Sequence, residues 1–428
     1  MATPLNIAIV GGGIAGLALA LGLHRHGISA KIYEAAPQMA EIGVGITLLP
    51  HGMRELATLG LADAMLDAGI ENRESAFFNR FGQKLFAEPR GKFAGYPQPE
   101  VGIHRGRLHG ILLAAVRERL GPEAVASDHQ FVSLEQSDTG VTLHFKTTSN
   151  GTGRAQITAD VAIACDGVNS AVRRQFYPNE SVAFTGINTW RGVTRRKPIL
   201  DGRTYMRIGS IKTGKIVIYP IVDNIDGTGD QLINWIAEIE SDKNNRNDWN
   251  SKGDRADFLP IYESFNFDWL DVGQLIRDAE TVLEYPMVDK DPVDRWTFGR
   301  VTFAGDAAHP MYPRGSNGSA QALIDVRTLA DLLAAHDDPR AAFSAYESER
   351  RPVTAAIVRT NRVSPPDIIN LKVEELVGDR PFENLDDYVS QAELRDLSDR
   401  YKHIAGFSVQ DTARPQNAVL AYSDGEID

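Results

Sequence analysis

The chain has 428 residues, of which 43% are hydrophobic, so it can bury a large core and is long enough for two domains. Its 45 basic and 57 acidic residues give a net charge of −12 without a basic stripe, which argues against nucleic-acid or anionic-membrane binding. The single cysteine, Cys165, excludes an internal disulfide and fits a reducing, cytoplasmic location.

The segment from residue 6 to Glu34 predicts a strand, a tight turn, a helix and a second strand that ends in a carboxylate. Gly11 permits the turn, Gly13 lets the backbone approach a pyrophosphate, and Gly16 lets helix and strand pack closely. Glu34 lies close to the spacing at which a carboxylate binds ribose hydroxyls and repels a 2′-phosphate. The segment therefore predicts binding of FAD or NAD rather than NADP, although close packing alone can also produce a glycine-rich turn.

The apolar start of the chain resembles a signal peptide, but it lacks a basic leader and contains these glycines. Elsewhere no run of about 18 apolar residues occurs, so a stable membrane insertion is not expected. Residues 111–120 predict an apolar helix, residues 131–145 alternate like antiparallel strands, and residues 161–164 form the continuous apolar run of a buried parallel strand.

Between about residues 181 and 289 the pattern changes to strands rich in aromatic residues, which indicates an inserted sheet. The strands expected there span residues 188–193, 215–221, 232–239 and 281–288. A buried strand at 300–304 and a long helix from about 319 to 335 follow. The tail beyond Arg362 is polar, interrupted by prolines and weakly helical, and we assign it no chemistry. The boundaries that we expect are a nucleotide-binding domain of residues 1–70, 100–180 and 290–365, a second domain of residues 71–99 and 181–289, and a tail of residues 366–428.

Two acidic residues follow buried strands, at the sheet edge where α/β proteins bind ligands. These are Asp166, before Gly167, and Asp306, after Gly305. Either aspartate alone could equally be a helix N-cap. Residues 311–319 then form a glycine-rich loop before a helix start, where amides and the helix dipole can stabilise negative charge.

With these motifs the chain resembles the group A flavoprotein aromatic hydroxylases, the family of 4-hydroxybenzoate and salicylate hydroxylases, from about residue 5 to residue 355. The resemblance implies an α/β fold with a Rossmann-like FAD-binding domain of the 4-hydroxybenzoate hydroxylase type, an inserted antiparallel-sheet substrate domain and a C-terminal helical tail. It also implies non-covalent FAD, NADH or NADPH as co-substrate, and O2. The residues that it assigns to FAD are Gly11, Gly13, Ala15, Gly16, Glu34, Arg105, Asp166, Gly167, Asp306, Gly318 and Ser319.

A closer similarity is to the 5-methylphenazine-1-carboxylate 1-monooxygenase branch of this family. It runs through residues 190–194, 219–221, 234–235, 285–289 and 311–313. It implies hydroxylation of an aromatic, carboxylated small molecule through a flavin C4a-hydroperoxide, with or without loss of carbon dioxide. Arg314 departs from that branch, where an apolar residue is expected, and this argues against a large flat phenazine substrate.

The inserted sheet is the expected wall of the substrate chamber. Its candidate substrate residues are Trp190, Tyr219, Trp235, Tyr285 and Met287, with Pro313 at the flavin, although aromatic and Met side chains on strands are as often core. A buried substrate carboxylate needs a cation, for which Arg314, Arg191 and Arg54 are candidates in that order, each with an ion pair as the alternative. No catalytic residue is assigned beyond the flavin-loop candidates Pro313 and Arg314. His309 could be a general base but is more simply structural.

Other functions share parts of this pattern. A flavin halogenase or prenyl-chain reductase has the same FAD domain, but the Trp-x-Trp-x-Ile-Pro segment of halogenases is absent from the sequence. A flavin-binding regulator without turnover and an NAD-dependent dehydrogenase are the remaining alternatives. We expect a monomer or homodimer without a metal site, whose partner is a small aromatic substrate.

Overall fold

The computed structural model describes residues 5–39, 43–148, 153–240, 251–406 and 408–409. A five-stranded parallel sheet forms the centre of the first domain, in the order β21-β12-β1-β2-β8. Its strands are β1 (Ile7–Val10), β2 (Ala30–Tyr33), β8 (Val125–Ala126), β12 (Val161–Ala164) and β21 (Val301–Phe303). Three of them, β1, β12 and β21, are buried along their whole length, because helices cover the sheet. The predicted α/β fold is confirmed.

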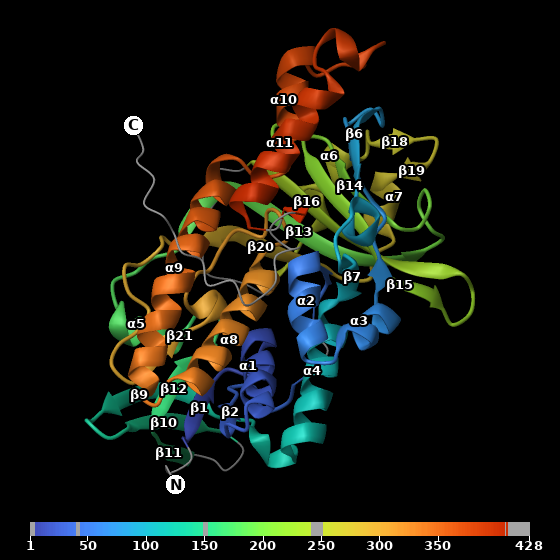
Figure 1. Cartoon of the computed structure of the whole chain (residues 1–428). Coiled ribbons are helices and arrows are strands. Elements are labelled where there is room, and N and C mark those ends of the chain that lie inside the picture. The colour runs from blue at the N-terminus through green and yellow to red at the C-terminus, as the bar shows by residue number, and fades with distance from the viewer. Residues whose placement is uncertain (1–4, 40–42, 149–152, 241–250, 407, 410–428) are drawn as a thin grey trace, which may run out of the picture.

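Helices α1 and α8 lie side by side against this sheet (Figure 1). The helices of the domain are α1 (Ile14–Arg25), α2 (Pro50–Thr58), α3 (Ala62–Ala68), α4 (Arg105–Leu120), α5 (Ala171–Phe176), α8 (Gly318–Ala335) and α9 (Pro339–Val363). Two small three-stranded sheets complete it, one of β3 (Gly45–Leu48), β7 (Val101–His104) and β4 (Ile70–Glu71), the other of β11 (Gly153–Ala159), β10 (Val141–Thr147) and β9 (Gln130–Gln136).

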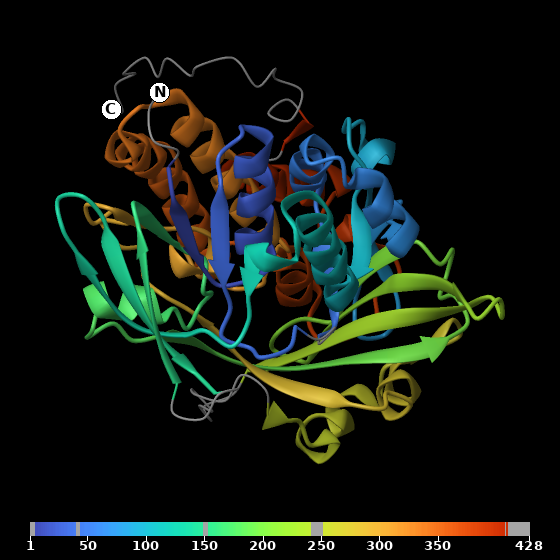
Figure 2. The ribbon, with the colours of Figure 1, turned by 90° about the horizontal axis from the view of Figure 1, so that it is seen from below.

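The inserted antiparallel sheet that the sequence predicts has eight strands, in the order β17-β20-β13-β16-β15-β14-β5-β6. They are β5 (Glu74–Phe78), β6 (Lys84–Pro89), β13 (Ala183–Arg196), β14 (Thr204–Ile208), β15 (Lys215–Ile225), β16 (Asp230–Glu240), β17 (Ser251–Lys252) and β20 (Val282–Asp289). Only the β14–β5 pair within it is parallel. Helices α6 (Leu259–Tyr262) and α7 (Val272–Arg277) cover the face that points away from the first domain (Figure 2). We call this the outer face and the opposite one the inner face.

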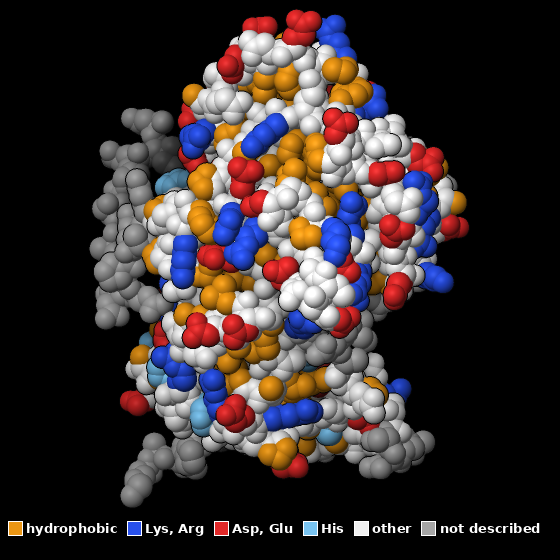
Figure 3. Space-filling model, turned by 90° about the vertical axis from the view of Figure 1, so that its right-hand side faces the viewer, with side chains coloured by type: hydrophobic (Ala, Val, Ile, Leu, Met, Phe, Trp, Pro, Cys, Tyr) orange, Lys and Arg blue, Asp and Glu red, His pale blue; other side chains and the backbone are white. Residues whose placement is uncertain are grey.

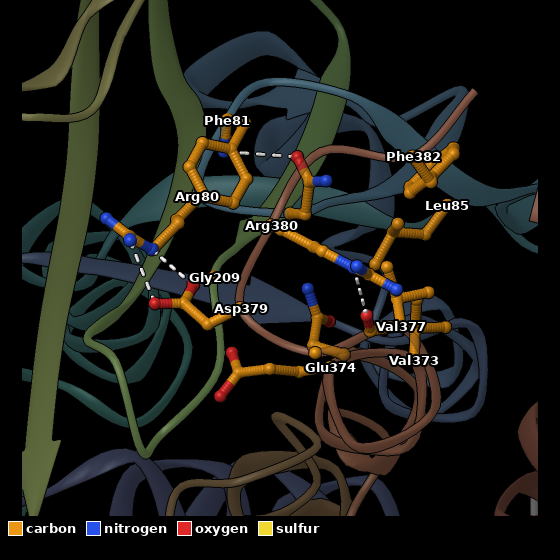
Figure 4. Close-up of a pocket in the computed structure, with 13 residues that line it drawn as sticks. Arg80, Phe81, Leu85, Gly209, Val373, Glu374, Val377, Asp379, Arg380 and Phe382 are labelled. Carbon is orange, nitrogen blue, oxygen red and sulfur yellow. Dashed lines mark hydrogen bonds and ion pairs between the residues drawn. The ribbon is translucent and has the colours of Figure 1, made fainter.

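The C-terminal tail is helical and packs on both domains. Helix α10 (Ile368–Val377) lies against the β5–β6 hairpin, and α11 (Gln391–Ile404) follows. At the end of α10, Arg80 donates to Asp379 at 2.8 Å, and Arg380 donates to the Val377 carbonyl oxygen at 3.0 Å (Figure 4). Basic and acidic side chains are interspersed on the face shown in Figure 3. Within the described ranges, no helix is apolar over a length that would cross a bilayer.

Trp190 and Trp235, which were predicted to line the substrate chamber, lie on the outer face instead. The Trp190 ring stacks on Phe258 at a centroid distance of 4.8 Å, beneath α6. The Trp235 indole nitrogen donates to the Thr194 hydroxyl at 3.1 Å, and its side chain is completely buried. Side chains alternate between the faces of a strand, so both tryptophans belong to the core under α6 and α7.

In this position Trp235 contributes to the stability of the fold. We expect Trp235→Ala to lower the free energy of unfolding by about 3–5 kcal/mol, because it leaves a cavity in a closed core. Phe93→Ala is the matched control, since half of the Phe93 side chain is exposed and its loss should change little. Urea unfolding followed by circular dichroism measures both, and equal effects would contradict the core assignment.

Candidate functional site

The glycine-rich turn after β1 has the geometry of a phosphate-binding loop. Gly11 has φ +104°, and a Cβ there would lie 2.5 Å from the Cys165 carbonyl oxygen. A Cβ on Gly16 would lie 2.0 Å from the Gly11 carbonyl oxygen, so helix and strand could not pack. At Gly13, by contrast, an added Cβ meets no described atom within 4 Å, which leaves open space at the start of α1. The loop therefore closes tightly on the protein and opens toward a ligand.

Glu34 fixes the same loop from the end of β2. Its carboxylate accepts hydrogen bonds from the Gly12 amide and from the Ala36 amide, both at 2.7 Å. The His109 ring on α4 contacts the Gly12 carbonyl oxygen at 2.8 Å. The carboxylate is half-buried beside the glycine loop, the position in which an acidic residue of a dinucleotide-binding fold is typically found.

Asp306 follows β21, at the carboxyl end of the same parallel sheet. Its carboxylate is exposed and makes no hydrogen bond to any described residue, unlike the other acidic groups around α8. An added Cβ on Gly318, the first residue of α8, would lie 4.0 Å from an Asp306 carboxylate oxygen. An accepting carboxylate beside a helix N-terminus suits a ribityl or ribose hydroxyl.

The other cofactor candidates lie around these groups. A Cβ on Gly305 would approach the Ala15 side chain to 3.2 Å, which brings the two loops into close packing. The Ser319 hydroxyl is buried in the first turn of α8 without a partner among the described residues. Asp166 accepts from the Ser170 hydroxyl at 2.5 Å and from the Ala171 amide at 2.8 Å at the start of α5, whose N-cap residue is Ser170. Asp166 is thus not itself the N-cap, but it holds the start of α5 in place just after Gly167, which has φ +77°.

A row of aromatic and cationic side chains crosses the inner face of the large sheet. From β20 to β5 the row contains Tyr285, Arg191, Tyr219, Tyr205, Arg207 and Phe77. The Arg191 guanidinium lies 5.1 Å from the Tyr285 ring centroid, and the Tyr205 and Tyr219 rings stack at 4.8 Å. Tyr219 also packs against Gly102 of β7, which ties the row to the first domain.

Arg207 is a residue of this row that no sequence pattern indicated. It is 5% exposed, and its guanidinium lies 4.5 Å from the Tyr205 ring centroid and 4.9 Å from that of Phe77. Its side chain donates to the Ser75 hydroxyl at 2.6 Å, and no carboxylate of the described chain lies within ion-pair distance of it. A buried cation without a counter-ion lowers the stability of the fold unless an anionic ligand pairs with it.

Comparison with known proteins decides the family. A model described as "FAD binding domain" matches residues 5–208 and 281–361. The chain is 39% identical to the phenazine 1,6-dicarboxylic acid hydroxylase PhzS of Lysobacter antibioticus, over 84% of this chain and 90% of the relative. It is 29% identical to 3-hydroxybenzoate 6-hydroxylase of Polaromonas naphthalenivorans (strain CJ2), over 84% of this chain and 86% of the relative.

The chain belongs to the FAD-dependent aromatic hydroxylases. It is therefore a monooxygenase that uses FAD, NAD(P)H and O2, as the resemblance implied. A solved salicylate hydroxylase substrate complex has the same fold, with a TM-score of 0.71 at 20% identity, over 98% of this chain and 100% of the other.

Two arginine candidates of this hydroxylase are already paired. Arg314 donates to Asp367 at 2.6 Å, and Arg54 forms an ion pair with Glu55 at 2.8 Å. The ion-pair alternative therefore applies to both. Arg191 is the candidate with no described carboxylate partner, and its buried Nε atom has no hydrogen bond within the described chain.

The loop of residues 311–317, which we call the flavin loop, borders a cavity. Pro313 is exposed, and its neighbours Tyr312 and Arg314 line a cavity of about 360 Å³ that also reaches Ile187 and Asp367. Met287 packs with Tyr312 and Ile187 beside it. Pro313 and Met287 thus lie where the loop, the inner sheet and the tail meet.

A buried polar network supports the loop from behind. Asp325 is completely buried and accepts from Arg350 at 2.8 Å, from the Gly305 amide at 3.2 Å, and interacts with His309. His309 is 4% exposed, and this pairing favours its structural role.

The network also fixes the orientation of two amides. Arg350 can only donate, so Gln321 accepts from it through Oε1 at 2.6 Å and turns its Nε2 toward Asn317 Oδ1 at 3.3 Å. Asn317 Oδ1 must then accept a second hydrogen bond from His51 Nε2, which lies 2.7 Å away. The proton of the His51 ring is therefore on Nε2. Burial lowers the pKa of His51 to about 4, so the ring is neutral.

His51 should therefore make folding pH-dependent. The unfolded ring titrates near pH 6.5, and between pH 4 and 6.5 the unfolded chain binds a proton that the folded chain excludes. The free energy of unfolding should therefore rise by about 3 kcal/mol as the pH increases through this window. Above pH 6.5 this contribution to stability is complete. We expect His51→Gln to reduce this slope in urea titrations between pH 4 and pH 7. His24→Gln, an exposed position on α1, is the control, and an unchanged slope in His51→Gln would contradict the assignment.

Proposed function

We propose that this monooxygenase hydroxylates a small aromatic carboxylate that lies on the inner face of the sheet, with its carboxylate on Arg207 and its ring on the side of Tyr205, Tyr219 and Arg191. The unpaired, buried guanidinium of Arg207 carries this proposal. Both relatives named above act, by name, on aromatic carboxylic acids, and this supports the same substrate class here.

The aromatic row suits a flat ring. Tyr205 and Tyr219 offer stacked ring surface between the two guanidinium groups, at the low entropic cost of side chains that are already packed. The whole chain carries a net charge of −12, so the cations of the inner face provide local selection for an anion. Burial strengthens that selection, because charge-assisted hydrogen bonds are stronger away from water.

The cofactor site fits FAD. The glycine loop accepts a diphosphate, Glu34 and Asp306 provide acceptors for hydroxyl groups, and the α8 N-terminus faces the loop of residues 311–317. FAD, when bound and reduced by NADH or NADPH, supplies the oxygen chemistry. The protein orients the substrate ring, excludes water and stabilises negative charge with the amides at the start of α8.

The position of attack decides the product. Attack at a C–H carbon adds one oxygen, whereas attack at the carbon that carries the carboxylate releases carbon dioxide. Hydroxybenzoates, aminohydroxybenzoates and phenazine carboxylates should be screened for stimulated oxidation of NADH and of NADPH, and mass spectrometry of the product separates the two outcomes. If the matching amides work as well as the acids, the carboxylate proposal is wrong.

Arg207 gives the sharpest mutational test. We expect Arg207→Gln to raise KM for the acid about 10- to 100-fold, as expected for a lost charge-assisted hydrogen bond of about 1.5–3 kcal/mol. The kcat should change less, since the carboxylate is bound before and during the reaction. Arg195→Gln is the matched control on β13, because Arg195 pairs with Asp226 and Asp230 at the surface. Equal KM values for the two variants would exclude Arg207 as the anchor.

A further inference from the structure

The C-terminal helix α11 reaches the flavin loop, although the matched family model ends at residue 361. Its Tyr401 is 4% exposed, and the Tyr401 hydroxyl lies 2.9 Å from Asn361 Oδ1 and 3.4 Å from the Arg314 carbonyl oxygen. The Asn361 Nδ2 group donates to the Tyr312 carbonyl oxygen at 3.3 Å, so Oδ1 of the same amide is the acceptor for Tyr401. One hydroxyl thus connects α9, α11 and the backbone of the loop.

The Tyr401 side chain restricts which residue can occupy position 315. Gly315 has φ +89°, and a Cβ there would lie 1.9 Å from the Tyr401 hydroxyl oxygen and 2.6 Å from the ring carbon that bears it. No side chain therefore fits at residue 315 while α11 is in place. The loop conformation and the position of the helix depend on each other.

Two further contacts join the tail to the same loop and helix. Asp367, at the start of α10, accepts from Arg314 at 2.6 Å and from Lys215 of β15 at 2.8 Å. The Ala405 carbonyl oxygen, at the end of α11, accepts from Gln321 of α8 at 3.5 Å. The loop is therefore held on both sides by residues of the tail.

The helix is anchored separately on the substrate sheet. Glu88 of β6 accepts from Lys402 at 2.7 Å and from Ser398 at 2.8 Å. Burial raises the pKa of Tyr401 well above its ordinary value, so its hydroxyl keeps its proton and remains a donor. Helix α11 thus fixes the position of the flavin loop relative to the substrate sheet.

We propose that Tyr401 is a positioning residue of this monooxygenase, and that α11 completes the flavin site by holding residues 312–315 in their cofactor-binding conformation. The inference rests on the FAD-dependent activity but not on the identity of the substrate. Without this contact the loop amides would no longer be aligned toward bound flavin. Flavin affinity and the fraction of NAD(P)H oxidation that yields hydroxylated product rather than peroxide should both fall.

Tyr401→Phe in the full-length chain removes the hydroxyl and keeps the ring. We expect about fivefold weaker FAD binding to the apoprotein, as for one lost hydrogen bond of about 1 kcal/mol. We also expect an altered visible spectrum of bound flavin, faster amide exchange across residues 311–317 and a larger peroxide fraction. Tyr388→Phe, an exposed position of the same tail, should change none of these.

Gly315→Ala provides an independent test that does not depend on the Tyr401 variant. Gly378→Ala is its matched control, because Gly378 has a similar φ of +81° but an added Cβ there meets no described atom within 4 Å. We expect Gly315→Ala alone to weaken FAD binding and to change the flavin spectrum.

Wild-type FAD affinity, flavin spectrum and loop exchange in Tyr401→Phe would overturn the proposal, as would equal behaviour of the Gly315→Ala and Gly378→Ala variants. These readouts need no aromatic substrate, so they are separate from the test of the carboxylate site. If Tyr401→Phe does not fold, the two glycine variants decide.

Discussion

The arrangement of the cofactor site depends on one buried carboxylate. Asp325 lies on α8 with no exposed surface, where burial would raise its pKa, but the positive charges of His309 and Arg350 outweigh burial and hold the pKa below its ordinary value. An ionised group in such a place is tolerable only when it is fully paired. Satisfying Asp325 therefore fixes the turn at Gly305, the helix α9 and the start of α8 relative to one another.

The same requirement extends along α8 to the flavin loop. Because Arg350 cannot accept a hydrogen bond, the Gln321 and Asn317 amides between it and His51 each have one allowed orientation. A neutral His51 that donates through Nε2 completes this series of hydrogen bonds. The loop is thus braced from the first domain by this network and from the tail by Tyr401. An anion-stabilising set of amides needs such rigidity, since preorganised dipoles do not have to reorient as charge develops.

Much of this architecture was predictable from sequence, because it depends on local patterns. The glycines at 11, 13 and 16, the strand at 161–164 and the helix after residue 318 have strong local signals, and the structure contains each element. The alternation of the inserted strands was also visible, but alternation alone does not say which face is inner. Trp190 and Trp235 were therefore assigned to the wrong side, whereas Arg191 and Tyr219 were on the side expected.

Arg207 and Arg314 show why the remaining site was not predictable. Arg207 lies on the short strand β14, which has no strong pattern of its own, and its significance comes from an absent counter-ion, which a sequence does not display. Arg314 has the opposite problem, because its partner Asp367 lies beyond the proline-rich break, in a tail that had no assigned chemistry. Ion pairing between distant segments decides whether an arginine is free to bind a ligand. On the proposed function the tail also bears on substrate selection, because by pairing with Arg314 it leaves Arg207 and Arg191 as the inner-face arginines without an ion pair among the described residues.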